Sequence, residues 1–424
     1  MKLRSIVSMT AVGLILFGLI SCSKSDELVV GVILPQEGSL EDYTFQILSG
    51  LEMAEEQINA MYKAGQTMTD EAFEEKYGRP KVTKKVTLIK KYESSNYEDV
   101  KVAVDSFKEL TDAGVVAVIG PASSAGVLAV TPFANKERIP IISPSATSPD
   151  INREGGDYVF RIYPSDTLEA QQLSYMVFQE CFAHHMLVVR STDSYGEGVS
   201  LEMLRFARRQ SDRIPNYVVK FDADPNVADF KTVVDQIVEE NPKAVFLGAY
   251  ADSLIPLIRE IKSRPELENL YIFCPSSFLP NQMIPELGPE NLQRLMFTKY
   301  DFDTSGANPK VADFARDFET KFGGTHPNIF AACGYDALMV LSVALNEVNT
   351  DLPDLVKTAL NKIHYPKDKG LLGETDFDKR GDVTRIPKVC RVTLEGDVAQ
   401  VTKEESAAIK REILTDVSDI SIGE

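Results

Sequence analysis

Two short apolar stretches, each ending in a loop rich in serine and threonine, constrain the fold of this chain most strongly. Residues 115–126 read Val-Val-Ala-Val-Ile-Gly-Pro-Ala-Ser-Ser-Ala-Gly, and residues 139–149 read Ile-Pro-Ile-Ile-Ser-Pro-Ser-Ala-Thr-Ser-Pro. Short apolar runs bounded by turn residues are typical of buried strands in a parallel sheet. The carboxyl ends of such strands meet at one edge of the sheet, where open α/β folds bind their ligands. We therefore expect the two loops to lie side by side at a ligand site.

The residues of the two loops suggest the chemistry of that ligand. Ser123 and Ser124 open a helix, where free backbone N–H groups and the positive end of the helix dipole favour an anion such as a carboxylate. The second loop adds the hydroxyls of Ser145 and Thr147, together with carbonyls of a backbone interrupted by prolines, and these suit an ammonium group. Together the loops predict a site for a small zwitterion. Helix capping is the alternative role for each of these hydroxyls.

Strand-like and helix-like segments alternate through most of the chain. The strand-like runs cover residues 29–33, 86–89, 115–119, 140–142, 158–162, 186–190, 217–221, 244–247, 270–273 and 295–297. This alternation predicts an α/β fold with doubly wound parallel sheets that carry helices on both faces. The chain is too long for one ordinary hydrophobic core, so we expect two lobes with a cleft between them.

Later segments are expected to divide between the two lobes. Residues 309–363 are helical by pattern and contain no strand, so they must cover a sheet formed elsewhere, and lobe 1 is short of helices. The run 388–401 then crosses back. We predict that lobe 1 comprises residues 27–162 and 301–380 and that lobe 2 comprises residues 163–300 and 381–402. Residues 403–424 are expected to form an acidic C-terminal tail that begins with a short helix.

The amino terminus has the features of an export signal. A basic start precedes an apolar run from Ile6 to Ile20, which is too short for a permanent membrane span and is typical of a signal peptide. The stretch Leu19-Ile-Ser-Cys22 resembles the lipobox of bacterial lipoproteins. That resemblance implies a signal peptide over residues 1–21, lipidation at Cys22 and a tether over residues 22–26. We therefore expect the protein in the periplasm or at the cell surface, anchored by lipid to a bacterial membrane.

The charge balance excludes some classes of partner. The chain has 63 acidic and 45 basic residues, a formal net charge of −18. Such an acidic protein is a poor match for nucleic acid or for anionic lipid headgroups, although a small pocket sets its own local field. Four scattered cysteines, Cys181, Cys274, Cys333 and Cys390, form no Cys-x-x-Cys pair. We interpret them as small core residues, and their disulfide state stays open.

Six ordered motifs resemble those of the branched-chain amino-acid binding proteins that serve ABC importers. The two hydroxyl-rich loops together form one of these motifs, and the other five are Gly38–Tyr43 with Gly50 and Asn59, Tyr158–Asp166, Asp193–Gly198, Gly334–Ala337 and Phe377–Asp382. The likeness runs from about Glu27 to Val401. It implies a type I periplasmic-binding fold, in which two lobes joined by three crossovers close over one ligand. It also implies ABC permease and ATPase subunits as partners, no cofactor, and a monomer.

The resemblance assigns binding roles to residues of lobe 1. Ser124 matches the helix-opening serine that grips the ligand carboxylate in the family. Ser145, Ala146 and Thr147 match the loop that holds both carboxylate and ammonium. Tyr43 matches a tyrosine that follows the first-loop glycine.

The resemblance also assigns contacts to lobe 2, with one departure. Tyr195 matches the tyrosine before Gly-Glu-Gly, and Tyr250 occupies about the position of the next family contact. Leucine-type relatives place an acid for the ligand ammonium after the strand 270–273, whereas this chain has Pro275-Ser-Ser-Phe278. Asp252 or Asp193 substitutes for that acid, or the ligand lacks an ammonium group.

Other functions match the sequence less well. The stretch 122–126 is one residue from the Gly-x-Ser-x-Gly nucleophile elbow, so a serine hydrolase using Ser124 with His326 or His364 as base is a distant alternative. The first glycine of that motif is missing, and we expect no enzyme. Residues 376–381 imitate the start of a calcium loop but lack its later ligands, so we expect a turn and no metal. A ligand-sensing lipoprotein of the same fold, for amides or other small carboxylates, is the closest alternative function.

Overall fold

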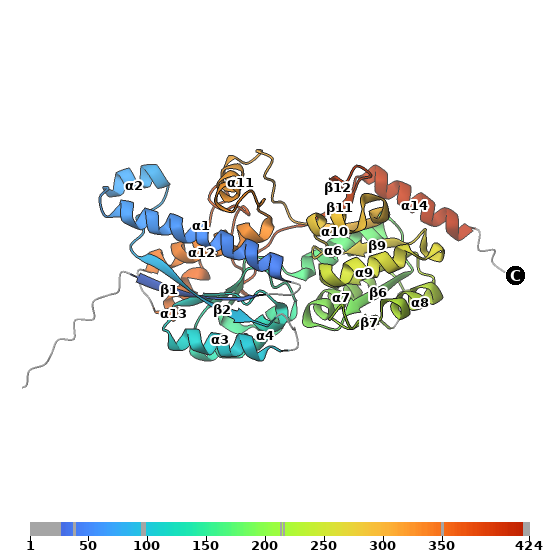
Figure 1. Ribbon diagram of the computed structural model, residues 1–424, viewed down its shortest axis with the longest axis horizontal. Coiled ribbons are helices and arrows are strands. Elements are labelled where there is room, and N and C mark those ends of the chain that lie inside the picture. The colour runs from blue at the N-terminus through green and yellow to red at the C-terminus, as the bar shows by residue number, and fades with distance from the viewer. Residues whose placement is uncertain are drawn as a thin grey trace, which may run out of the picture.

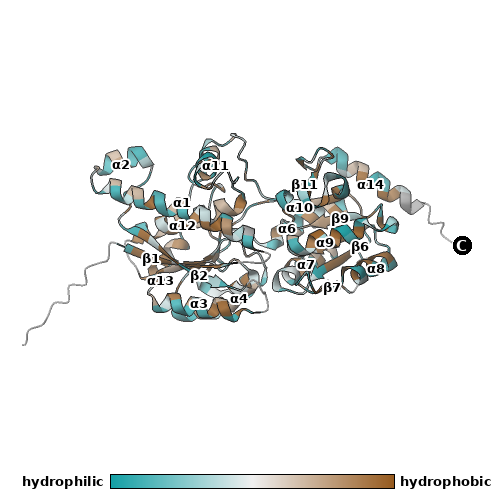
Figure 2. Cartoon of the chain, viewed as in Figure 1, coloured by the Kyte–Doolittle hydropathy of each residue, from teal (hydrophilic) through white to brown (hydrophobic). Residues whose placement is uncertain are grey.

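The chain forms two α/β lobes that lie side by side along the long axis of the molecule (Figure 1). The computed structural model describes residues 27–36, 40–94, 99–212, 214, 217–348 and 352–418. The predicted signal peptide, the lipidation site Cys22 and the tether all lie outside the described residues. Hydrophobic side chains concentrate along the strands and on the helix faces that cover them (Figure 2).

Lobe 1 is built on a sheet with strand order β2-β1-β3-β4-β5, in which every pairing is parallel. The strands are β1 (Glu27–Pro35), β2 (Lys85–Glu93), β3 (Ala117–Ile119), β4 (Ile141–Ser143) and β5 (Val159–Arg161). Strands β3, β4 and β5 are buried along their whole length, as expected for apolar runs covered by helices on both faces. The two loops after β3 and β4 therefore emerge from neighbouring strands at the same edge.

Helices from both ends of the chain cover the lobe 1 sheet. They are α1 (Glu41–Gly65), α2 (Asp70–Tyr77), α3 (Lys101–Asp112), α4 (Ser124–Glu137), α5 (Asp150–Glu154), α11 (Pro309–Lys321), α12 (Ile329–Val348) and α13 (Pro353–Leu360). Helices α1 and α12 pack over one face, and α3 and α4 pack over the other (Figure 1). The strandless region after residue 309 thus supplies the helices that the lobe 1 sheet lacked, as its pattern predicted.

A pair of glycines lets α1 and α12 approach each other closely. A Cβ atom added at Gly50 would lie 2.0 Å from the carbonyl oxygen of Ala331, and one added at Gly334 would lie 2.2 Å from the carbonyl oxygen of Ile47. No side chain fits in either place, so both motif glycines are explained by backbone contact. Helix α12 is also long and apolar enough to cross a membrane, but 83% of its apolar window is buried inside the protein. It is the central core helix of lobe 1.

Lobe 2 is built on a sheet with strand order β12-β11-β10-β9-β8-β6-β7. The strands are β6 (Met186–Ser191), β7 (Val219–Phe221), β8 (Ala244–Gly248), β9 (Tyr271–Cys274), β10 (Leu295–Lys299), β11 (Lys388–Val392) and β12 (Val398–Gln400). Strands β6 to β10 are parallel, whereas β11 and β12 are antiparallel to their neighbours. The prediction of a parallel sheet is therefore incomplete at this edge. A tight turn, in which Thr393 N donates to Asp397 O at 2.8 Å, forces β11 and β12 into a hairpin.

The lobe 2 helices lie on both faces of that sheet. They are α6 (Asp166–Tyr175), α7 (Ser194–Ala207), α8 (Phe230–Glu240), α9 (Ala251–Lys262), α10 (Pro280–Leu287) and α14 (Lys403–Ser418). Helix α14 covers most of the segment expected to be a short helix and a loose tail, and it is longer than predicted. Its Glu405 pairs with Arg391, and its Glu412 accepts a hydrogen bond from Tyr271 at 2.6 Å. These contacts and the buried Ile413 dock the helix against lobe 2.

The connections between the lobes are held by a buried arginine. The Arg161 side chain is fully buried at the end of β5 and donates to both carboxylate oxygens of Asp382, at 2.7 Å each. A third bond reaches the carbonyl of Ser148 at 2.9 Å. This bidentate ion pair ties the crossover after β5 to the segment that leads into β11. The four cysteines in the described chain are buried and unpaired, in agreement with the interpretation as core residues.

Candidate functional site

A small buried cavity lies where the two lobes meet. Its volume is about 20 Å³. The residues that line it come from both lobes and from the first crossover: Tyr43, Ser145, Thr147, Tyr163, Tyr195, Tyr250, Ser276, Ser277 and Phe330. Five of the eight ligand-binding residues predicted from the sequence are in this set, although they are spread over more than 200 positions of the chain. Strand ends and helix starts on both lobes converge here, as expected for a ligand site in an α/β fold.

The lobe 1 wall is formed by the loop after β4 and the start of α1. Ser145 Oγ donates to the carbonyl of Ala122 at 2.9 Å, which ties the two hydroxyl-rich loops together. Ser143 Oγ makes a second tie, to the carbonyl of Pro121 at 2.6 Å. Thr147 Oγ1 is buried, and the one group near enough to interact with it among the described residues is the Asp166 carboxylate, in poor hydrogen-bond geometry. Thr147 therefore places a hydroxyl and a neighbouring acid at the cavity wall, where both are available to a bound molecule.

The lobe 2 wall is aromatic with a hydroxyl beside it. The rings of Tyr195, in the first turn of α7, and Tyr250, just before α9, stack with centroids 4.4 Å apart and planes at 23°. Ser277 Oγ, in the loop after β9, donates to the carbonyl of Ala249 at 2.7 Å. Two amphipathic rings therefore face lobe 1 across the cavity.

Four lining residues were not assigned as site residues from the sequence. Tyr163 lies on the crossover after β5, Phe330 begins α12, and Ser276 and Ser277 follow β9. Tyr163 stacks on Phe330 with centroids 5.6 Å apart, and its hydroxyl donates to Ser276 Oγ at 2.9 Å. The sequence did give a signal for the two serines, because they lie in the stretch 275–278, where leucine-type relatives place an acid. Nothing local marks Phe330, which becomes a site residue only when α12 returns to lobe 1.

Three predicted residues do not line the cavity. Ser124 is buried, and its Oγ accepts a hydrogen bond from Ser148 N at 3.2 Å, so it connects the two loops from behind. Ala146 packs into the apolar cluster beneath the loop. Asp252 lies in the first turn of α9, where its Oδ1 accepts from Ser253 N at 2.8 Å. Asp193, the other suggested acid, caps α7 by accepting from Gly196 N at 2.7 Å. A direct ligand contact for Ser124, Ala146 or Asp252 stays a prediction.

The anion-binding position before α4 is already taken by a carboxylate of the protein. Glu93, at the end of β2, accepts from Ala122 N at 2.6 Å and Ser123 N at 3.3 Å, and Ser123 Oγ also donates to it. Burial raises the pKa of Glu93 to about 7, although these hydrogen bonds oppose the rise. Ser123 Oγ in turn accepts from Gly126 N and caps the helix. The backbone N–H groups of Ala122 and Ser123 therefore bind Glu93, an internal acid that the sequence analysis did not consider.

A pair of buried carboxylates lies directly behind the cavity. Asp166 and Glu169 are one turn apart on α6, and both are fully buried. Glu169 accepts from Ser276 N, Ser276 Oγ and Thr298 Oγ1, each at 2.6 Å. Asp166 forms no ion pair among the described residues, and the one side chain that hydrogen-bonds its carboxylate and lowers its pKa is the Thr147 hydroxyl, while its backbone N–H donates to Thr147 O at 3.0 Å. A buried acid without a cationic partner is thus attached to the loop that forms the lobe 1 wall.

Burial and mutual repulsion shift the titration of this pair. Burial, followed by the neighbouring Glu169 carboxylate, raises the pKa of Asp166 well above its ordinary value, and Thr147 and Arg161 only partly offset this. Burial likewise raises the pKa of Glu169, against the lowering effect of its bonds to Ser276 and Thr298. Arg161, the basic residue closest in sequence to Asp166, already forms an ion pair with Asp382. The pair would therefore be stabilised by a cation supplied from the cavity.

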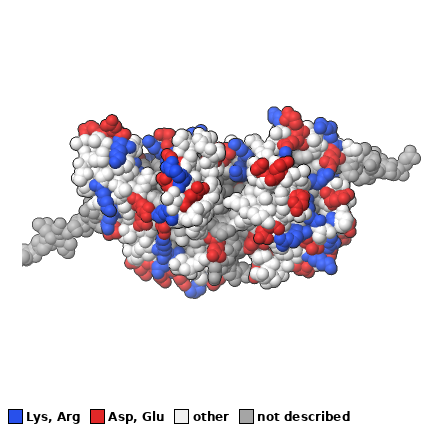
Figure 3. Space-filling model, turned by 45° about the horizontal axis from the view of Figure 1, so that its top comes forward, with Lys and Arg blue, Asp and Glu red and all other residues white. Residues whose placement is uncertain are grey.

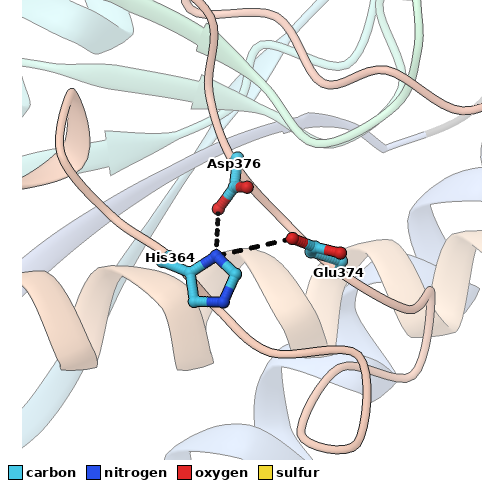
Figure 4. A group of neighbouring side chains, drawn as sticks. All are labelled: His364, Glu374 and Asp376. Atoms are coloured by element: carbon cyan, nitrogen blue, oxygen red, sulfur yellow. Dashed lines mark hydrogen bonds and ion pairs between the residues drawn. The ribbon is translucent and has the colours of Figure 1, made fainter.

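A group of three side chains outside the cavity has an ordinary structural explanation. His364 Nδ1 lies 2.9 Å from Asp376 Oδ1 and 3.5 Å from Glu374 Oε1 (Figure 4). The antiparallel bridge between Tyr365 and Thr375 brings these side chains together, and all three are exposed. An ordinary surface ion pair accounts for these distances. On the face seen in Figure 3, acidic and basic side chains are interspersed over both lobes.

The hydrolase alternative lacks its base in the described structure. His326 Nδ1 lies 2.5 Å from Glu319 Oε1, and its Nε2 lies 3.0 Å from Thr304 Oγ1. His364 is held by the ion pair just described. Neither histidine forms a hydrogen bond with Ser124 in the part of the chain that the structure describes, so the required nucleophile–base pair is not assembled.

Comparisons with known proteins agree on the family. The profile of the family described as periplasmic binding protein matches residues 27–392. A Leu/Ile/Val/Thr-binding protein of Salmonella typhimurium is 24% identical over 88% of this chain and 92% of its own. A crystal structure of a leucine binding protein from Thermotoga maritima has a TM-score of 0.71, with 22% identity over 88% of this chain and 98% of that chain. A solute binding protein from Rhodopseudomonas palustris in complex with 3,4-dihydroxy benzoic acid has a TM-score of 0.68 and 14% identity, over 89% of this chain and 96% of that chain.

Proposed function

The chain belongs to the periplasmic binding protein family, and from this premise we propose that it captures a small amino acid, branched-chain or related, and delivers it to an ABC importer. The names of the Salmonella and Thermotoga relatives support this ligand class. The observation that carries the proposal is the single cavity at which predicted contacts from both lobes meet. Capture followed by lobe closure is the mechanism that such a site serves.

The ligand ammonium is proposed to bind beside Thr147 and Asp166. A cation here would give the buried Asp166 carboxylate the opposite charge that it lacks, beside the Thr147 hydroxyl that already interacts with it. In this arrangement Asp166 takes the role of the acid that leucine-type relatives carry after the strand equivalent to β9. The carboxylate of the ligand is proposed to lie against the loop after β4, near Ser145.

Closure is proposed to complete the site. Ser145 and Thr147 belong to lobe 1, whereas Tyr195 and Tyr250 belong to lobe 2, so a ligand docked on lobe 1 meets both rings only when the lobes close. We expect Tyr195→Phe to shorten the bound lifetime more than it slows association, because its contact forms after docking. Stopped-flow measurements of both rate constants test this order of events.

Calorimetry with free amino acids tests the proposed function directly. The chain contains no tryptophan, so titration calorimetry or tyrosine fluorescence is the practical measurement. We expect stoichiometric binding without turnover, and a ligand at a hundred times Kd should stabilise the fold by about 2.7 kcal/mol. A benzoate-type ligand that binds while every amino acid fails would instead favour the alternative role in sensing or transporting other small carboxylates, as in the Rhodopseudomonas structure.

Membrane attachment through Cys22 is a separate part of the proposal. Its support is the lipobox-like stretch Leu19-Ile-Ser-Cys22 behind an apolar segment. We expect the protein expressed in bacteria to incorporate labelled fatty acid and to partition into detergent, and Cys22→Ser to abolish both. Labelling that persists in the Cys22→Ser variant would contradict this anchor.

A further inference from the structure

A second, much larger crevice adjoins the buried cavity. Its volume is about 510 Å³, and it shares Tyr163, Ser276 and Phe330 with the wall of the small cavity. It runs between the start of α12 on lobe 1 and the β9–α10 loop on lobe 2, along the crossover after β10. The two spaces are therefore neighbours that share part of one wall.

The sizes of the two spaces limit what each of them can hold. A cavity of about 20 Å³ has room for about one water molecule, whereas small-molecule pockets usually measure about 300–1,000 Å³. With the lobes placed as they are, the cavity beside Thr147 holds only part of a head group, so the lobes would have to separate slightly to admit a complete one. The adjoining crevice is of ordinary ligand size and is the nearest space into which a side chain could extend.

The lining of the crevice indicates what it would accept. Its inner wall is aromatic, with Tyr163, Tyr300 and Phe302 among its residues, and this suits an unbranched aliphatic stem. The outer rim is polar and includes two amide side chains, Asn281 and Asn328.

The rim charges are largely compensated within the protein. Asp301 pairs with Lys388 at 2.7 Å, Asp303 accepts from Ser305 N at 2.9 Å, and His326 pairs with Glu319. Lys299 also lines the rim, on the same crossover as the two aspartates. Acidic and basic groups thus occur together, which favours a neutral polar group over a charged one.

We propose that this crevice is the side-chain subsite, and that the ligand is an α-amino acid with a long, uncharged polar side chain. The head group would occupy the small cavity, the stem would pass Tyr163 and Phe330, and the polar end would reach Asn281 and Asn328. This inference rests on the proposed function, since it requires the head group to bind beside Thr147. It narrows the ligand from branched-chain residues to longer, amide- or urea-bearing ones.

Titration calorimetry with L-alanine, L-leucine and L-citrulline tests the subsite. L-Alanine probes the head-group cavity alone, and L-citrulline carries an unbranched stem with a neutral polar end. We expect L-citrulline to bind the wild-type protein at least about 10-fold more tightly than either shorter ligand, because its additional side-chain atoms contact the lining of the crevice. Wild-type protein that binds L-alanine or L-leucine as tightly as L-citrulline would overturn the subsite while leaving the proposed function intact. If no amino acid binds, both proposals fail.

A blocking variant locates the effect in the crevice. Asn281 is exposed near the start of α10, so Asn281→Trp should fill the crevice without disturbing the core. We expect this variant to lose the preference for L-citrulline by about 10-fold and to bind L-alanine unchanged. Glu286→Trp, on the same helix but away from the crevice lining, is the matched control and should behave like wild type. An unchanged preference in Asn281→Trp would refute the assignment.

Discussion

Replacing Asp166 with asparagine should make the empty protein more stable and ligand binding weaker. Asp166 is fully buried and has no ion-pair partner among the described residues, and only the Thr147 side chain hydrogen-bonds its carboxylate. Asparagine is neutral without having to take up a proton, so the free energy of unfolding at neutral pH should rise by about 1–3 kcal/mol. In a lobe of this size each kcal/mol corresponds to about 2–4 °C in Tm.

The sign of the pH dependence follows from the raised pKa of Asp166. Burial and the Glu169 carboxylate favour the protonated form in the folded state, so the stability contributed by that proton is fully present below the ordinary pKa of the unfolded chain. It is lost as the pH rises toward the higher pKa of the folded protein. The gain in Tm of Asp166→Asn over wild type should therefore grow with pH. Scanning calorimetry of both proteins without ligand measures it.

The same substitution tests the role of Asp166 as the partner of the ligand ammonium. A hydrogen bond to a charged group contributes about 1.5–3 kcal/mol, so Asp166→Asn should weaken amino-acid binding by about 10- to 150-fold. Binding to wild-type protein should also release protons, which calorimetry in buffers of different ionisation enthalpy detects. A variant that is less stable and binds like wild type would refute the reasoning, because Asp166 would then be a structural acid.

Four further substitutions separate roles within the same lobe. Thr147→Val should weaken binding by about 10-fold or more with little loss of Tm. Ser124→Ala should instead cost about 1–3 kcal/mol of stability, because it leaves Ser148 N without an acceptor. Calorimetry with and without ligand distinguishes the two effects. Gly50→Ala should destabilise the protein by about 1–3 kcal/mol in urea, because its methyl group would meet the backbone of α12; an unchanged midpoint would contradict the packing described. Because the pKa of Glu93 is raised to about 7, wild-type stability should fall as the pH rises through that value, and Glu93→Gln should remove this fall in urea titrations between about pH 5 and pH 9. Parallel pH profiles for the two proteins would disprove that assignment.

The sequence was informative wherever a signal is local. Alternating apolar runs and helical stripes predicted the strands and helices of both lobes, since these periods reflect which face each element buries. The hydroxyl-rich loops 120–126 and 143–149 were correctly expected to lie side by side, because neighbouring parallel strands end at one sheet edge. The antiparallel hairpin β11–β12 was missed, since a parallel edge has nearly the same local pattern, and the helix expected after residue 403 is longer than predicted and docks on lobe 2.

Which side chains face the ligand cavity was decided only by the tertiary structure. Ser124 and Thr147 look alike in the sequence, yet one connects the loops from behind and the other faces the cavity. Glu93 occupies the helix start that the sequence left open for a ligand, across about 30 residues of chain. Asp166 and Glu169 become an acid pair behind the site because the helix that carries them is buried there, and Ser276 and Thr298, more than 100 residues later, bind Glu169. Local periodicity determines the elements, whereas burial and the partners of a polar group depend on contacts between distant segments, and those contacts determine its chemistry.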